Sequence, residues 1–219
     1  MMEVFLLAGV RTPIGKFLGQ FSGLSAPDLA AISLRETLAR AAVDPASIDE
    51  VILGNVLSAG VGQAPARQSA LKAGLPETVA AVTINKVCGS GLKAVMLAAQ
   101  AVRAGDAKLI LAGGMESMSN APHVVRGIRL GQKYGNVPLE DVLLKDGLIC
   151  AFGDCHMGNY AEATAKAFGI SRADQDAYAA ESQLLAGAAI QEGLFHSEIV
   201  PITLPQKSGA VTIKTDEGP

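Results

Sequence analysis

The chain has 219 residues, a length that suits one large domain or two small ones. Apolar residues make up 49% of it and charged residues 18%, which excludes global disorder and allows a packed core. A formal charge of -3, with 4% aromatic residues and no Trp, excludes a basic or aromatic surface for nucleic acid. No apolar run approaches the ~20 residues of a membrane span, and no signal-peptide pattern is present, so we expect no membrane association.

The three cysteines are Cys88, Cys150 and Cys155, and no two of them have CxxC spacing. An odd number without paired spacing argues against a disulfide framework, so we expect a reducing, cytoplasmic setting. Cys150, Cys155 and His156 supply only three metal ligands at an unusual spacing, and no further Cys or His cluster completes a tetrahedron. We therefore expect no metal site.

Strand and helix signals alternate over the first half of the chain. We expect strands at residues 3–8, 51–53, 79–85 and 107–112, and helices from 26 to about 42, 65–73 and 89–104. This alternation predicts an α/β fold whose sheet is covered by helices on both faces.

Beyond residue 117 the composition changes, and residues 117–153 indicate loops around short elements. A capping box at Ser171 predicts a helix that runs to about Glu192, followed by strands near 198–204 and 210–214. We therefore expect an α/β domain over residues 1–118 and a loop-rich domain over residues 119–219.

Cys88 is the strongest candidate nucleophile. It lies between a predicted strand and a long predicted helix, in the sequence Val87-Cys88-Gly89-Ser90-Gly91. The positive end of a helix dipole favours a thiolate, and the backbone N–H of Cys88 would face a developing oxyanion. The alternative is a buried structural cysteine on a glycine-rich turn, because free Cys is among the most buried residue types.

The Cys88 segment resembles the acyl-thioester signature of the thiolases, the acetyl-CoA acetyltransferases. Further segments resemble thiolase stretches in the same order along essentially the whole chain: Val10–Gly15, Gly54–Leu57, Gln63–Arg67, Gly113–His123, Asp146–Leu148, His156–Gly158, Asp174–Ala179 and Thr215–Glu217. The resemblance implies the N-terminal half of the layered αβαβα thiolase fold, with most of its loop domain.

The resemblance also implies roles for individual residues. Cys88 would take up an acetyl group as a thioester. Leu148, His156 and Met157 would line the coenzyme A pocket, although His156 is also explained as a loop histidine satisfied by backbone. Gln63 and Arg67 would lie in the stretch that contacts a second subunit. No cofactor is implied, since coenzyme A thioesters are the substrates.

Two catalytic parts of the family are missing from this sequence. Thiolases take a His from a Gly-His-Pro motif and a second Cys from a Cys-x-Gly-x-Gly motif, and neither motif occurs here. The polar end at 215–219 follows a strand directly, so the fold is expected to be incomplete. We expect a second polypeptide that supplies the other half, in a dimer or tetramer of such pairs. The alternatives are an inactive fragment and a non-catalytic subunit that binds acyl-coenzyme A.

Overall fold

The computed structural model describes residues 3–206 and 209–218, and their contacts divide the chain into two compact units. The first unit contains the residues up to Asn120 together with Phe195–Gly218. The second contains Ala121–Leu194. Residues 195–218, which the sequence analysis assigned to a loop domain over 119–219, thus belong to the first unit by their contacts.

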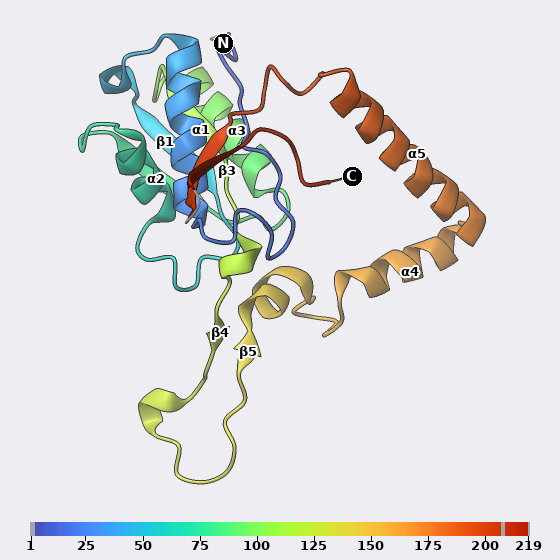
Figure 1. Cartoon of the computed structure of the whole chain (residues 1–219). Helices are drawn as coiled ribbons and strands as arrows, with labels where there is room; N and C mark the ends of the chain where they lie inside the picture. Colours follow the sequence, from blue (N-terminus) through green and yellow to red (C-terminus); the bar gives the residue numbers. More distant parts are fainter. Residues whose placement is uncertain (1–2, 207–208, 219) are drawn as a thin grey trace. The chain divides into compact units, whose positions relative to one another are not determined.

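A three-stranded parallel sheet forms the centre of the first unit (Figure 1). Its strands are β1 (Glu50–Gly54), β2 (Ala80–Ile84) and β3 (Ile110–Gly114), in the order β2-β1-β3. The helices are α1 (Ala26–Ala41) before β1, α2 (Pro65–Ala73) between β1 and β2, and α3 (Ser90–Ala104) between β2 and β3. The predicted succession of strands and helices is confirmed from β1 to β3.

Helices cover both faces of this sheet. Val51 and Leu53 of the central strand are buried in one apolar cluster with residues of α1 and α2. Ile52, which points to the opposite face, packs with Ala94 and Ala98 of α3. A strand buried on both faces is typical of parallel α/β sheets, so the α/β fold class is confirmed.

The helix ends follow the local signals in the sequence. Ser25 accepts the backbone N–H of Asp28, whose carboxylate in turn accepts the Ser25 N–H, so the predicted capping box at α1 is confirmed. Gly74 and Gly105 end α2 and α3 in the left-handed conformation. Glycine adopts this conformation without the steric cost of a Cβ.

The predicted strand at residues 3–8 is wrong. This segment has no ladder partner within the described part of the chain, and Phe5, Leu6 and Leu7 are exposed. A strand needs hydrogen bonds from a neighbouring strand, which apolar composition alone does not provide. The segment instead runs along a groove of about 290 Å³ that is also lined by β3, α1 and α3.

A hairpin of β6 (Ile202–Gln206) and β7 (Gly209–Ile213) also belongs to the first unit and confirms the two late strands. Ile202 and Ile213 are buried with Phe21 in a small cluster, against partly buried side chains of α1. The hairpin is thereby fixed to the same helix that covers the central sheet.

Arg11 joins the N-terminal loop to the segment after the hairpin. Its guanidinium donates to both carboxylate oxygens of Asp216, at 2.7 and 3.0 Å, and to Glu198 at 2.6 Å. Asp216 also accepts the backbone N–H of Ile14 at 2.7 Å. The hydrogen bond from Arg11 is the main cause that lowers the pKa of Asp216, whose side chain is 9% exposed. This bidentate pair therefore fixes two segments that are about 200 residues apart in sequence.

The second unit is described by itself. Its strands β4 (His123–Val124) and β5 (Glu140–Asp141) pair antiparallel, and a π-helical turn spans Leu143–Leu148. Helices α4 (Met157–Phe168) and α5 (Arg172–Gln191) follow.

The structure confirms the predicted capping box and helix after Ser171, whereas the sequence analysis did not predict α4. Short 3-10 turns lie at Pro45–Ser47, Met118–Asn120 and Ile128–Leu130. Among the described residues, no helix is both long enough and apolar enough to cross a membrane.

Replacing Asp216 by Asn tests the ion pair with Arg11 that links the N-terminal loop to the segment after the hairpin. We expect a loss of about 2 kcal/mol in the free energy of unfolding, because the largely buried carboxylate that pairs with the half-buried Arg11 guanidinium is removed. Denaturant titration of wild type and variant measures this loss. Glu36→Gln, which breaks the more exposed pair with Arg40 in the same unit, is the control and should change stability by less than about 0.5 kcal/mol.

The ion pair between Arg11 and Asp216 also makes the free energy of unfolding depend on pH. The pKa of Asp216 is lower in the native protein than its ordinary value of 3.8, so the unfolded chain binds more protons in this range. The stability difference between wild type and Asp216→Asn should be fully present above about pH 5 and shrink as the pH falls below about 4. A difference that grows on acidification would contradict this origin.

Candidate active site

Cys88 lies on a tight turn between β2 and α3. Val87 takes the left-handed conformation, with φ of 48°, and the Gly89 N–H donates to the Lys86 carbonyl at 3.1 Å. Cys88 is exposed, so it is not the buried structural thiol that was the alternative interpretation. Its catalytic role stays a prediction.

Ser90 stabilises this turn, a role that the sequence analysis missed. Its buried hydroxyl accepts the Lys86 N–H at 2.8 Å and donates to the Val87 carbonyl at 2.7 Å. A Ser at the start of a predicted helix, directly after a glycine-bearing turn, was the available signal. The two hydrogen bonds fix the backbone on both sides of Cys88.

Three glycines allow the start of α3 to approach the sheet. A Cβ on Gly54, at the end of β1, would lie 2.5 Å from the Ser90 Cβ, so no larger residue fits there. A Cβ on Gly114, at the end of β3, would lie 3.1 Å from the Gly91 Cα. The carboxyl ends of the strands and the N-terminus of α3 therefore meet at Cys88, the edge where open α/β sheets bind ligands.

Asn55 and Glu116 hold the loop after β1 next to this edge. The Asn55 amide donates to Glu116 at 2.8 Å, and the Glu116 carboxylate accepts the backbone N–H groups of Val56 and Leu57 at 2.9 and 3.1 Å. Both residues lie in segments that resemble thiolases, but nothing in the sequence pairs them across 61 positions. They shape the rim of the candidate site.

The predicted subunit-contact residues lie at the start of α2. The Arg67 guanidinium donates to the backbone carbonyls of Glu77, at 2.6 Å, and of Val79, which ties α2 to the segment before β2. Gln63 is exposed, and its carbonyl accepts the side-chain amide of Gln68 at 2.8 Å. The contact of Gln63 and Arg67 with a second subunit stays a prediction.

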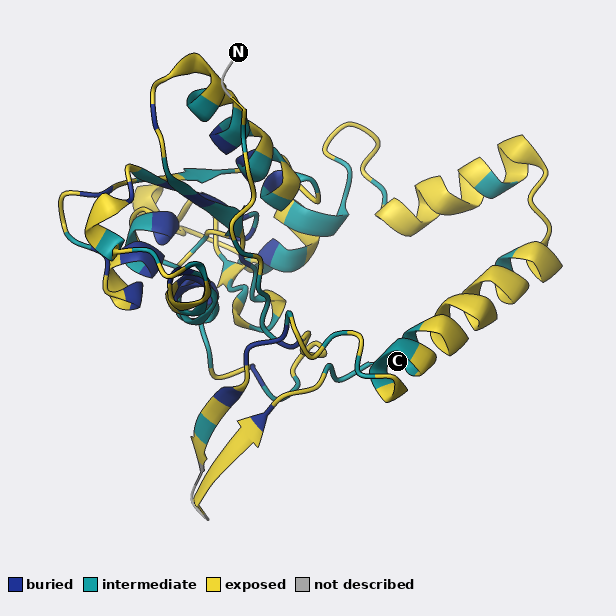
Figure 2. Cartoon of the chain, turned by 90° about the horizontal axis from the view of Figure 1, so that it is seen from above, coloured by how far each residue is buried: buried dark blue, intermediate teal, exposed yellow. Residues whose placement is uncertain are grey.

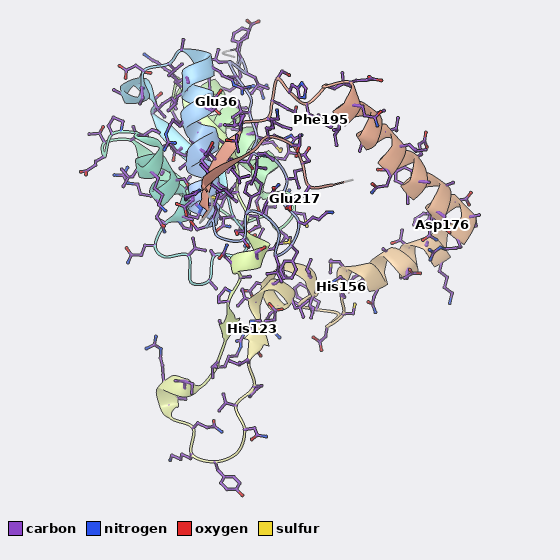
Figure 3. The ribbon with its side chains drawn as sticks, viewed as in Figure 1. Glu36, His123, His156, Asp176, Phe195 and Glu217 are labelled. Atoms are coloured by element: carbon purple, nitrogen blue, oxygen red, sulfur yellow. The ribbon has the colours of Figure 1, made fainter. Side chains whose placement is uncertain are left out.

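Leu148, His156 and Met157 come together within the second unit. An antiparallel bridge joins Ile149, which follows Leu148 at the end of the π-helical turn, to His156, which precedes Met157 at the start of α4. His156 caps α4, with its Nδ1 accepting the Gly158 N–H at 3.0 Å (Figure 3). His156 and Met157 are exposed and Leu148 is half-buried. Cys88 belongs to the other unit, and the role of these three residues in coenzyme A binding stays a prediction.

Over residues 3–206 and 209–218, no group of three or more His, Cys, Asp or Glu side chains is arranged to hold a metal ion.

The sheet and the Cys88 turn define an α/β protein with a cysteine presented at a strand–helix elbow. The sequence model of one protein family, the thiolase N-terminal domain, matches residues 4–219 of the chain. The chain is 51% identical to the acetyl-CoA acetyltransferase of Pseudomonas aeruginosa, over 100% of this chain and 56% of that protein. It is 51% identical to the acetyl-CoA acetyltransferase of Cupriavidus necator and 50% identical to the probable acetyl-CoA acetyltransferase of Escherichia coli, over 99% and 100% of this chain and 56% of each relative.

The chain therefore belongs to the thiolase family and carries its N-terminal domain. It spans about 56% of the length of these relatives.

Replacing Gly54 by Ala tests the close approach at the elbow. The added Cβ would displace the start of α3, so we expect a loss of about 1–3 kcal/mol in the free energy of unfolding and a changed alkylation rate of Cys88. Gly23→Ala is the matched control, since a Cβ there meets nothing within 4 Å. It should alter stability by less than about 0.5 kcal/mol. Equal effects of the two substitutions would contradict the packing role of Gly54.

Proposed function

We propose that this chain is the nucleophile-bearing part of an acetyl-CoA acetyltransferase, which interconverts acetoacetyl-CoA plus coenzyme A with two acetyl-CoA. The observation that carries the proposal is the exposed Cys88 at the elbow of a thiolase N-terminal domain. The names of the Pseudomonas and Cupriavidus relatives support it further.

The proposed reaction has two halves. In the degradative direction, the Cys88 thiolate attacks the β-keto carbonyl of acetoacetyl-CoA, and the carbon–carbon bond breaks. The departing enolate of acetyl-CoA takes a proton, and the acetyl group remains on Cys88 as a thioester. The thiol of free coenzyme A then attacks this thioester, which gives a second acetyl-CoA and returns the Cys88 thiol. Synthesis is the reverse sequence.

Backbone groups at the elbow suit this chemistry. The turn from Lys86 to Ser90 presents Cys88 at the N-terminus of α3, where the helix dipole favours negative charge. We propose that the Cys88 N–H helps to bind the oxyanion that forms on the attacked carbonyl. Leu148, His156 and Met157 would hold the coenzyme A thioester, and no further cofactor is needed.

Completion of the site requires groups that this sequence lacks. A base must take a proton from the methyl group of the second acetyl-CoA, and an imidazole must help to ionise Cys88. We propose that a second polypeptide with the C-terminal thiolase half supplies both the His and the second Cys.

Two apolar surfaces support such a partner. In the first unit, the groove between residues 3–8 and β3 is lined mainly by apolar side chains, and Leu92 and Met96 of α3 are exposed. In the second unit, α4 and α5 have no buried residue among those described, and Leu184 and Leu185 are exposed (Figure 2). Apolar surface of this extent marks a site of protein association.

A cytoplasmic location is also part of the proposal. All three cysteines are free thiols in the structure, which suits a reducing compartment.

Acetylation of Cys88 tests the nucleophile. The protein as isolated from its source is incubated with acetyl-CoA, quenched in acid and digested with trypsin. We expect one acetyl group on the peptide of residues 87–93, and none after Cys88→Ala. Cys150→Ser is the control and should be labelled like wild type. A protein that binds coenzyme A but is never acetylated at Cys88 would instead be a non-catalytic binding subunit.

The native mass of the protein isolated from its source tests the partner. We expect a second polypeptide in fixed ratio, with the Gly-His-Pro and Cys-x-Gly-x-Gly motifs in its sequence. A single species with the mass of this chain would contradict the catalytic proposal. A single longer polypeptide carrying both halves would contradict the two-chain arrangement and leave the role of Cys88 standing.

A further inference from the structure

Cys150 and Cys155 lie opposite each other at the base of a short turn in the second unit. The Ile149–His156 bridge continues into a hydrogen bond from the Cys150 N–H to the Cys155 carbonyl at 2.9 Å. Residues 151–154 close the turn, and the Asp154 N–H donates to the Cys150 carbonyl at 2.9 Å. Cys150 and Cys155 thus share one of the two hydrogen bonds of a regular antiparallel pair, in which opposite residues have Cα atoms about 4.5–5.5 Å apart. Disulfides have the same Cα separation.

Tyr160 brings the two sulfur atoms to a common point. Its hydroxyl donates to the Cys150 Sγ at 3.4 Å, and the nearby Cys155 thiol also contributes to the raised pKa of Tyr160. A Cβ built on Gly153 would collide with the Tyr160 hydroxyl and lie 3.5 Å from the Cys155 Sγ. The Gly153 N–H, in turn, donates to the Cys150 Sγ at 3.4 Å. Both thiols therefore border one small space above Gly153.

The hydrogen bonds also affect the reactivity of the pair. Donation by the Tyr160 hydroxyl, helped by the backbone N–H of Gly153, lowers the pKa of the Cys150 thiol. The same interaction raises the pKa of Tyr160 to about 12. Cys150 is half-buried rather than buried, so a small reagent can reach it. A thiolate that is accessible and stabilised by donors is the form that attacks disulfides.

We propose that Cys150 and Cys155 are a dithiol site that forms a reversible disulfide by exchange with a low-molecular-weight disulfide such as oxidised glutathione. The Cys150 thiolate attacks one sulfur of the reagent, forms a mixed disulfide and releases one glutathione thiolate. The Cys155 thiolate then attacks the Cys150 sulfur and releases the second glutathione. Two protein thiols are oxidised to one disulfide, and the reagent is reduced to two thiols, which take up the protons that the cysteines lose.

The disulfide would close the turn that leads directly into His156, the residue that caps α4. This site is separate from Cys88 in the sequence and does not depend on acyl transfer, so it stands or falls independently of the proposed function.

The test is an exchange experiment on the full chain. The protein is equilibrated with oxidised and reduced glutathione at neutral pH, quenched in acid, alkylated and digested with trypsin. Both cysteines lie in the peptide of residues 146–166, and Cys88 lies in the peptide of residues 87–93. We expect the wild-type 146–166 peptide to be lighter than its reduced form by two hydrogen atoms and to carry no alkyl group.

Single variants show whether the two thiols react with each other. In Cys150→Ser and in Cys155→Ser the remaining thiol should stop at the mixed disulfide with glutathione. A wild-type peptide with two glutathiones would overturn the proposal. A wild-type peptide that stays reduced while Cys88 carries glutathione would also overturn the proposal. A disulfide between Cys88 and either of the two cysteines would do the same.

Tyr160→Phe tests the contribution of the hydroxyl. It keeps the ring and removes the donor to sulfur, so exchange at Cys150 should slow roughly 2–5-fold at neutral pH. An unchanged rate would overturn the assignment of Tyr160 to the site.

Discussion

The contact between the N-terminus of α3 and the ends of β1 and β3 is the constraint on which the candidate active site depends. It exists because Gly54, Gly91 and Gly114 carry no side chain where backbones approach. The approach lets Ser90 fix the turn and leaves Cys88 exposed at the positive end of a helix. The glycines therefore matter for the proposed chemistry through packing.

Local signals predicted most of the fold. The capping box at Ser25 and the glycines that end α2 and α3 act over a few residues, so the sequence contains all the information that they need. The strand predicted at residues 3–8 failed because strand formation depends on a neighbour that no local pattern specifies. The ion pair between Arg11 and Asp216 was not predictable from local sequence either, since the two residues are 205 positions apart.

In the candidate site, too, some features follow from local sequence and others depend on distant segments. About ten residues around Cys88 are enough to predict its position between a strand and a helix. The resemblance to thiolases supplied its expected role. The support that Glu116 gives to the loop after β1 comes from a distant segment and was missed. Leu148, His156 and Met157 were predicted as coenzyme A residues only through the family, and the Ile149–His156 bridge joins the segments that carry them.

The most direct measurement is the first half-reaction with acetoacetyl-CoA, in the absence of free coenzyme A, of the protein as isolated from its source. We expect release of one acetyl-CoA per Cys88 and then no further reaction, because the acetyl group remains on the enzyme until coenzyme A arrives. Addition of coenzyme A should restart turnover. Continuous turnover without coenzyme A, or a burst that survives Cys88→Ala, would contradict the assignment of Cys88 as the nucleophile.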